Sequence, residues 1–127
     1  MARILKSLYK NCRIAGAGLN HTSITVLMTV RNGEPYISDA VSSILNQTYV
    51  GFRFLIVDNA SIDNSVATIK SLHDSRIDIV ELKENIGQTA ALNHALEMID
   101  TPWVARMDAD DISLPSRLEL QMAYIGS

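Results

Sequence analysis

Short apolar runs and stretches with helical spacing alternate along the chain from Ile24 onward. The first run, Ile24 to Val30, is nearly continuous in apolar and β-branched residues, which is typical of a strand buried on both faces of a parallel sheet. Apolar side chains then recur at three- and four-residue spacings over Glu34–Thr48, which predicts an amphipathic helix with Pro35 in its first turn. The same patterns predict strands over Phe52–Val57, Ile77–Leu82 and Pro102–Met107, and helices over Val66–Leu72, Gln88–Ile99 and from Leu114 onward.

This alternation predicts an α/β fold: βα units that form a mostly parallel sheet with helices on both faces. The run Ile77–Leu82 alternates apolar and polar residues, so it is expected to be the least buried strand. Asp63 or Ser61 is expected to cap the helix that follows the second strand. In such sheets, ligands bind beyond the carboxyl ends of the strands. The segments expected to converge there are Thr29–Glu34, Asp58–Asp63 and Asp108–Ser113.

Composition indicates one globular domain, since 47% of the 127 residues are hydrophobic and 20% are charged. We assign residues 24–127 to this domain. Residues 1–23 carry four basic side chains and no acidic one, so we interpret them as a basic N-terminal tail. The alternative is a short amphipathic helix, with Ile4, Leu5, Leu8 and Tyr9, that rests on an anionic membrane surface.

The net charge of −3 argues against nucleic acid as a partner, because phosphate backbones are bound by clustered Lys and Arg. The single cysteine, Cys12, cannot form an internal disulfide, which favours a reducing compartment. No apolar run approaches the roughly 18 to 20 residues that span a bilayer. We therefore expect a cytoplasmic protein, with contact at the inner face of the membrane as the variant that the basic tail would support.

The acidic run Asp108-Ala109-Asp110-Asp111 is the strongest candidate for chemistry. Three carboxylates at the end of an apolar strand repel one another, so a cation is expected among them. Oxygen ligands suit Mn²⁺ or Mg²⁺, and Asp108 and Asp110 are the predicted metal ligands. The alternative is helix capping, for which one Asp would suffice. A calcium loop fits poorly, since its turn position holds Ser113 in place of Gly.

Asp58 is the second candidate, because it follows a buried strand and could accept a hydrogen bond from a pyrimidine base or a ribose. Its alternative is again a helix cap, for which Asp63 and Ser61 are better placed. The sequence holds neither a P-loop nor a Gly-x-Gly-x-x-Gly motif, so ATPase and dinucleotide-binding functions lack their fingerprints.

Taken together, these segments resemble the N-terminal part of a family 2 glycosyltransferase with the GT-A type fold, a Rossmann-like half-domain. The resemblance extends from Ile24 to Leu118 and is specific because several motifs occur in the same order and spacing. These motifs are Val26–Glu34, Ser43–Tyr49, Leu55–Ser65, Asn85–Gly87 through Ala91–Asn93, and Ala105–Asp111 to Pro115–Arg117.

The resemblance implies a transferase that moves a sugar from a nucleotide diphosphate sugar, often a UDP-sugar, with inversion at the anomeric carbon. Asp58 matches the acid that contacts the base, and Asp108 and Asp110 match the metal-binding Asp-x-Asp motif. The other positions carried over as substrate-binding are Thr29, Arg31, Glu34, Asn59, Asn85, Gly87 and Asn93. Thr29 stands where Pro is usual, Arg31 where an aromatic is usual, and Asn59-Ala60 where Asp-Gly is usual.

In this family the catalytic base and the acceptor-binding half follow the Asp-x-Asp motif. We therefore expect the chain to be a donor-binding portion, with its acceptor sugar, lipid or protein unknown. An open sheet edge would favour self-association. The alternative function is a non-catalytic nucleotide- or metal-binding module that pairs with another chain, and a plain α/β scaffold would bind no nucleotide.

We predict that the purified 127-residue chain binds nucleotide without transferring sugar. The measurement is product formation from a radiolabelled UDP-sugar with a panel of sugar and lipid acceptors. Detection of transfer by this chain alone would contradict the assignment of the catalytic base to residues outside it.

Overall fold

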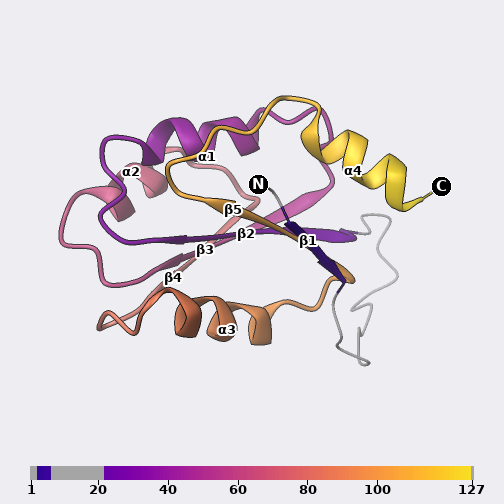
Figure 1. The fold of residues 1–127 in the computed structure, drawn as a ribbon. Helices are drawn as coiled ribbons and strands as arrows, with labels where there is room; N and C mark the ends of the chain where they lie inside the picture. The colour runs from indigo at the N-terminus through magenta and orange to yellow at the C-terminus, as the bar shows by residue number, and fades with distance from the viewer. Residues whose placement is uncertain (1–2, 7–21, 127) are drawn as a thin grey trace.

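The computed structural model describes residues 3–6 and 22–126, and its centre is a five-stranded sheet. Four strands are parallel: β2 (Ile24–Val30), β3 (Phe52–Asp58), β4 (Ile77–Glu81) and β5 (Trp103–Asp108). The fifth strand, β1 (Arg3–Lys6), is antiparallel, and the order across the sheet is β1-β5-β2-β3-β4. The predicted α/β fold with a mostly parallel sheet is confirmed (Figure 1).

Helices cover both faces of the sheet (Figure 1). On one face lie α1 (Ile37–Leu45), α2 (Ser65–Ser71) and α4 (Arg117–Ile125), whose apolar side chains pack with Met28, Phe54 and Ile56 in the larger core. On the other face α3 (Gln88–Met98) packs Ala91 and Ala95 against Leu27 and Val57. The small alanines let α3 lie close to the sheet. Each face of the sheet therefore has its own core, one under α1, α2 and α4 and one under α3.

Two helices begin later than their sequence pattern predicts. The helix expected from Glu34 begins at Ile37, so Pro35 lies in the turn before α1, where Tyr36 and Ile37 both donate their N–H groups to the carbonyl of Gly33. The last helix begins at Arg117 because a separate turn, Arg117 N to Leu114 O at 3.1 Å, precedes it. In both cases apolar periodicity extends into a turn that has no helical hydrogen-bond ladder.

One part of the segment 1–23, which the sequence predicts to be a basic tail, belongs to the sheet. Residues 3–6 form β1, which pairs antiparallel with β5 in the register Arg3↔Arg106 to Lys6↔Trp103. The unpaired backbone groups at the edge of β5 offer hydrogen bonds that no local pattern in the leader reveals. Leu8, Tyr9 and Cys12 lie outside the described residues. Across 3–6 and 22–126, no helix is long and apolar enough to cross a membrane.

The other sheet edge is β4, which is the least buried parallel strand, as predicted. Its exposed acidic side chains form ion pairs with neighbouring basic side chains, Asp78 with Arg53 and Glu81 with Lys70. Charged side chains along an edge strand disfavour pairing with another chain. β1 covers the edge of β5, and charged side chains line the edge strand β4. Self-association through an open edge stays a prediction.

At the amino end of the sheet, a buried pair of hydroxyl groups joins β2 to the segment before β5. Thr25 Oγ1 and Thr101 Oγ1 lie 2.9 Å apart, and Thr101 Oγ1 also donates to the carbonyl of Trp103 at 2.9 Å. Since the single hydroxyl proton of Thr101 goes to Trp103, Thr25 is the donor within the pair. Thr101 therefore makes two hydrogen bonds and Thr25 one.

Replacing Thr101 by Val should destabilise the protein more than replacing Thr25. Thr101→Val leaves the Thr25 hydroxyl and the Trp103 carbonyl without their partner, at a cost of about 1–3 kcal/mol, whereas Thr25→Val leaves no donor unsatisfied. Urea unfolding of the two single variants measures the difference. Equal losses would show that the direction of the hydrogen bond is wrong.

Candidate functional site

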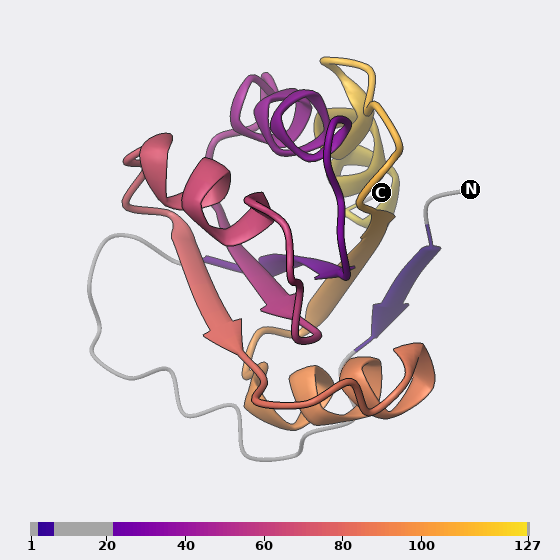
Figure 2. The same cartoon turned by 90° about the vertical axis from the view of Figure 1, so that its left-hand side faces the viewer.

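The carboxyl ends of β2, β3 and β5 meet as the sequence predicts, and the edge they form faces the viewer in Figure 2. Thr29 of β2 is half-buried and lies opposite Val57 on one side and Asp108 on the other. The next residue, Val30, lies opposite Asp58. Asp58 and Asp108 therefore flank the end of a single strand.

The loop after β2 is bound to the loop after β3. Arg31 Nη1 donates to the carbonyls of Asn59 at 3.1 Å and Ala60 at 2.7 Å. Asn32 N donates to Ser61 Oγ, and Asn32 Oδ1 accepts from Ile62 N, both at 2.8 Å. Arg31, expected as a nucleotide contact, thus has a structural role, because its guanidinium holds the two loops together.

Glu34 and Asp63 make the next connection between these loops. Glu34 N donates to Asp63 Oδ2 at 3.1 Å, and Glu34 Oε1 accepts from Thr68 Oγ1 at 2.6 Å. Asp63 Oδ1 accepts from both the backbone N and the hydroxyl of Ser65, so Asp63 and not Ser61 satisfies the first turn of α2. The bond from the Ser65 hydroxyl is the main cause that lowers the pKa of Asp63. The Glu34 carboxylate faces α2 in this arrangement.

Asp58 is buried, with only 3% of its surface exposed, and its two carboxylate oxygens differ. Oδ2 accepts from Ser61 N at 3.2 Å, whereas Oδ1 is buried and has no hydrogen-bond partner among the described residues. An unsatisfied buried carboxylate oxygen costs free energy, so a donor from a ligand would be favoured at this position. A capping role uses only Oδ2 and leaves Oδ1 unexplained.

A chain of amides extends from Asp58 to the loop before α3. Asn59 is buried, donates from Nδ2 to Asn85 Oδ1 and accepts from Ile86 N at Oδ1, each at 3.0 Å. Asn85 Oδ1 also accepts from Gly87 N, and Gly87 has a φ of +85°, which suits glycine. Asn59, Asn85 and Gly87 are thus brought together and shape the wall beside Asp58. Asn93 lies exposed on α3, and no hydrogen bond joins it to these three residues in the described structure.

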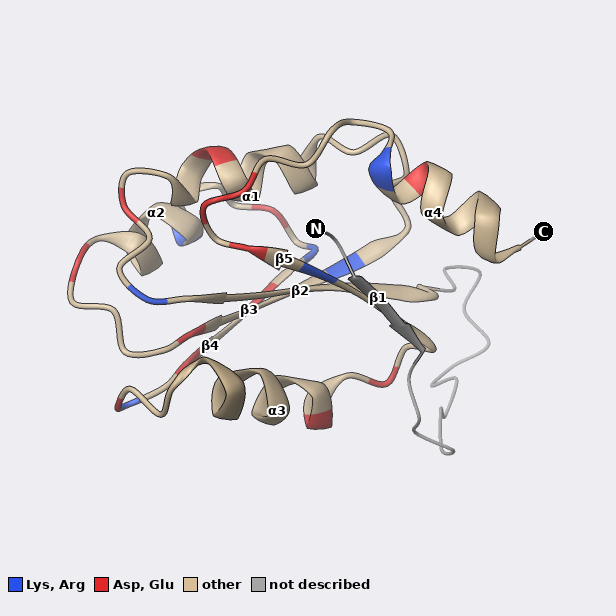
Figure 3. Ribbon diagram, in the orientation of Figure 1, with Lys and Arg blue, Asp and Glu red and all other residues tan. Residues whose placement is uncertain are grey.

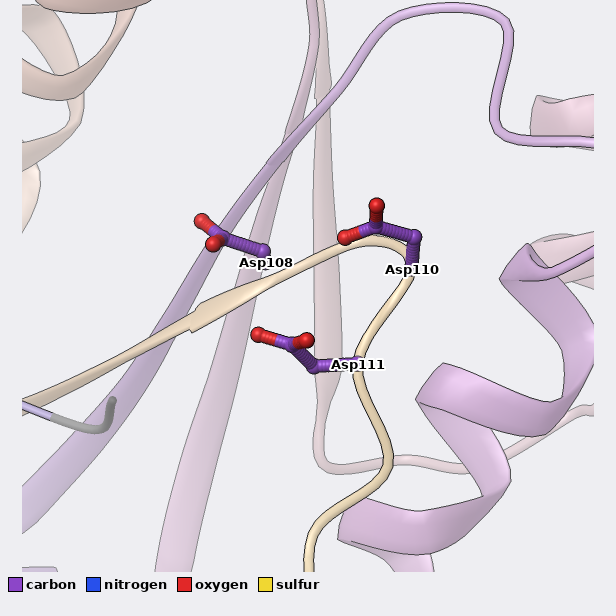
Figure 4. Close-up of side chains that lie close together, drawn as sticks. All are labelled: Asp108, Asp110 and Asp111. Atoms are coloured by element: carbon purple, nitrogen blue, oxygen red, sulfur yellow. The ribbon is translucent and has the colours of Figure 1, made fainter.

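The acidic run forms an exposed group of carboxylates after β5. Asp108, Asp110 and Asp111 place one oxygen each within 4.8 Å of the others (Figure 4). Arg106 Nη2 lies 3.5 Å from Asp108 Oδ1. Figure 3 shows basic and acidic positions close together at this end of β5. In the described part of the chain, no ion pair involves Asp110. Arg106 therefore offsets part of the charge, and Asp110 and Asp111 are the two carboxylates of the group without an ion pair among the described residues.

The geometry of these carboxylates fits a small divalent cation. Two ligands at about 2.1 Å from Mg²⁺ lie at most about 4.2 Å apart, so the group must contract by a few tenths of an ångström. All three side chains are exposed and rotate freely enough to allow this. Hard oxygen donors are also the ligands that Mg²⁺ and Mn²⁺ prefer.

Polar side chains at the carboxyl end of α1 hold the segment that follows the acidic run. Ser43 Oγ accepts from Ser113 N at 3.0 Å. Gln47, which is buried, donates to the carbonyl of Leu114 at 2.7 Å and accepts from Leu118 N at 3.0 Å. The sequence patterns assign no role to Gln47. The signal that could have found it is a large amide on the apolar side of an amphipathic helix, where a polar group must be hydrogen-bonded.

A pocket of about 410 Å³ opens beside the acidic run, between the end of β5 and the start of α4. Arg106, Arg117, Asp108 and Asp111 supply its charged wall, and Ile112, Leu114 and Leu120 supply an apolar one. Burial lowers the pKa of the Arg117 guanidinium, and the charge of Asp111 acts in the opposite direction. The acidic turn thus borders an amphipathic hollow.

Comparison with known proteins assigns a family to this arrangement. Residues 25–127 match the family model of Glycosyl transferase family 2. The O-antigen biosynthesis glycosyltransferase WbnJ of Escherichia coli is 39% identical over 106 residues, which are 80% of this chain and 41% of WbnJ. The E. coli UDP-Glc:alpha-D-GlcNAc-diphosphoundecaprenol beta-1,3-glucosyltransferase WfgD is 33% identical over 102 residues, 80% of this chain and 40% of WfgD. The chain spans between 29% and 44% of the length of these and similar curated relatives.

Solved structures share the fold. Staphylococcus aureus TarS in complex with UDP superimposes with a TM-score of 0.77 at 23% identity, over 82% of this chain and 32% of TarS. The mannosyltransferase PcManGT from Pyrobaculum calidifontis, in complex with GDP-Man and Mn²⁺, gives a TM-score of 0.68 at 27% identity, over 80% of this chain and 31% of that enzyme. The expected GT-A type fold is therefore confirmed.

Replacing Ala60 by glycine should stabilise the protein, because the φ of Ala60, +61°, lies in the left-handed region. A side chain costs about 1–2 kcal/mol there, which exceeds the roughly 0.5–1 kcal/mol that glycine loses in chain entropy. Ala60→Gly should therefore raise the free energy of unfolding by up to about 1 kcal/mol. Urea unfolding measures it.

Ala67→Gly is the matched control, since Ala67 is exposed inside α2, where glycine should cost about 1 kcal/mol. A loss of stability in both variants would mean that the backbone at Ala60 is unstrained.

Proposed function

The chain belongs to glycosyl transferase family 2, and from this premise we propose that it is the donor-binding portion of a glycosyltransferase. It binds a nucleotide diphosphate sugar, with uridine as the nucleoside and Mn²⁺ or Mg²⁺ as the cation. The observation that carries the proposal is the position of Asp58 and Asp108 on either side of the end of β2. Two strand spacings, about 10 Å, separate β3 from β5, a distance that a ribose between a base and a diphosphate can span.

The base lies against Asp58 in this proposal. Asp58 Oδ1 lacks a partner in the described structure and accepts the N3–H of uracil, while Ser61 N holds Oδ2 in place. Arg31 fixes the carbonyls of Asn59 and Ala60 beside it, and Asn85 supports Asn59 from the other side. The wall is built before the ligand arrives, so little conformational entropy is lost on binding.

The diphosphate lies against the acidic run. Asp108 and Asp110 would hold the cation, with Asp110 as the more direct ligand because Arg106 already lies beside Asp108. A bound cation supplies Lewis-acid stabilisation to the departing diphosphate. Thr29 lies between the two subsites, opposite Asp108 in the sheet, and borders the path of the ribose. Glu34, Gly87 and Asn93 stay predicted donor contacts, although the Glu34 carboxylate binds Thr68 in the structure.

The chain covers less than half the length of its relatives, so we propose that further residues complete the reaction. We assign residues 24–127 to donor binding and residues 1–23 to a basic leader whose first part pairs with the sheet. We propose inverting transfer to an acceptor, with the catalytic base supplied from outside these residues. The reducing environment that one cysteine favours supports a cytoplasmic location, with peripheral contact at the membrane as a variant.

Two substitutions should separate the base and metal subsites. Asp58→Asn should weaken UDP binding about tenfold without Mn²⁺, because an amide N–H would then face the uracil N–H. Asp110→Ala should leave metal-free UDP binding unchanged and remove the strengthening by Mn²⁺. Isothermal titration calorimetry with and without Mn²⁺ measures both effects, and GDP in place of UDP reports base preference.

Asp78→Ala, which removes an exposed acid from β4, is the control and should change neither affinity. Mn²⁺-strengthened UDP binding that persists in Asp110→Ala would refute the metal subsite. Unchanged UDP affinity in Asp58→Asn would refute the base subsite. Wild-type protein that binds neither UDP nor GDP would favour a scaffold.

A further inference from the structure

One guanidinium group joins the two ends of the acidic turn. Arg117 Nη1 donates to Ser113 Oγ at 2.9 Å, and Arg117 Nη2 donates to the carbonyl of Arg106 at 3.0 Å. Arg106 directly precedes the segment 107–112 and Ser113 directly follows it. This segment contains all three clustered aspartates. The side chain of Arg117 therefore closes a loop around the entire acidic run.

Met107 and Asp108 are held by the pairing of β5 with β2, whereas the rest of the acidic turn has few backbone restraints. Within it, one backbone hydrogen bond joins Asp111 N to Asp108 O at 3.2 Å. Its three carboxylates are exposed and repel one another, which favours an open turn. Ser113 is buried and its hydroxyl also lies 3.3 Å from Met107 Sδ, so the far end of the turn is fixed where Arg117 binds it. The two hydrogen bonds of Arg117 join the ends of the turn and so oppose the repulsion between its three carboxylates.

Arg117 is itself held in position by the segment that follows α1. Gln47 accepts from Leu118 N, the residue next to Arg117, and Thr48 N donates to the carbonyl of Pro115 at 2.9 Å. Leu118 is completely buried in the larger core. The first turn of α4 therefore presents a guanidinium whose direction is set before any ligand binds.

We propose that Arg117 is the positioning residue of the donor site, keeping Asp108 and Asp110 in the geometry that a divalent cation needs. The inference rests on the proposed function, and Arg117 acts through the turn without touching the substrate. The planar fork of a guanidinium reaches two acceptors at once, which a lysine ammonium on a flexible stem cannot reproduce. Arg117→Lys therefore tests the fork while it keeps the charge.

Hydrogen exchange without metal or nucleotide tests the closure itself. In Arg117→Lys, the amides of Asp111 and Ser113, measured by NMR, should exchange about tenfold faster than in the wild type, because the turn opens more often. Ser113→Ala removes one of the two bonds and should give a smaller increase at Asp111. Unchanged exchange at these amides in Arg117→Lys would overturn the proposal.

Arg76→Met is the matched control. Arg76 is also a half-buried arginine that joins two segments, through Asp74 and the carbonyl of Leu45, but it precedes β4 at the opposite end of the sheet. The substitution should lower the free energy of unfolding without changing exchange at Asp111. Faster exchange at Asp111 in Arg76→Met would mean that general destabilisation, and not Arg117, controls the turn.

Metal binding provides the second measurement. Mn²⁺ affinity, followed by electron paramagnetic resonance, should fall about 10- to 100-fold in Arg117→Lys, while metal-free UDP affinity stays at the wild-type value. Methylguanidine added to Arg117→Ala should restore part of the Mn²⁺ affinity, an effect that lost stability alone would not produce. Wild-type Mn²⁺ affinity in Arg117→Lys would overturn the positioning role. If the wild type binds no Mn²⁺, the proposed metal site fails, and the exchange data still decide whether Arg117 closes the turn.

Discussion

The parallel pairing of β2 with β3 on one side and β5 on the other is the constraint on which the rest of the structure depends. Because the strands run in one direction, their carboxyl ends, and the polar loops after them, emerge at the same edge of the sheet. The register then decides which residues flank the end of β2: Asp58 lies on one side and Asp108 on the other. A shift of one residue in either pairing would turn these side chains to the opposite face and disrupt both cores. Burial of the two cores thus also fixes the candidate site.

Hydrogen bonds between loops refine what the sheet provides. Arg31 ties the second loop to the first, and Asn59 ties it to the loop before α3. The acidic turn is fixed differently, through Ser43 on α1, Gln47 just after α1, and Arg117 on α4. Most polar residues around the candidate site therefore bind other parts of the protein. Among the described residues, Asp58 Oδ1 has no hydrogen-bond partner, and the carboxylates of Asp110 and Asp111 have no ion pair, so these groups could bind a ligand.

Much of this could be predicted from sequence because it depends on local patterns. Continuous apolar runs such as Ile24–Val30 are typical of buried parallel strands, and acids directly after such runs must lie at the carboxyl edge. The strand formed by residues 3–6 could not be predicted, since it depends on the free edge of β5, about a hundred positions further along the chain. The structural role of Arg31 was missed for the same reason: its partners, two backbone carbonyls, leave no mark in the sequence. Gln47 and Arg117 belong to motifs that the sequence reveals, but their role depends on the meeting of the segment after α1 with the start of α4, which no local pattern predicts.

A crystal structure of the chain with UDP and Mn²⁺, with anomalous scattering collected near the manganese edge, tests the central claim most directly. The account predicts one anomalous peak at coordination distance, about 2.1–2.2 Å, from carboxylate oxygens of Asp110 or Asp108. It also predicts that the uracil N3–H donates to Asp58 Oδ1, so that a single nucleotide extends past the end of β2. A manganese peak away from the acidic run, or a uracil bound elsewhere with Asp58 Oδ1 still unpaired, would contradict it.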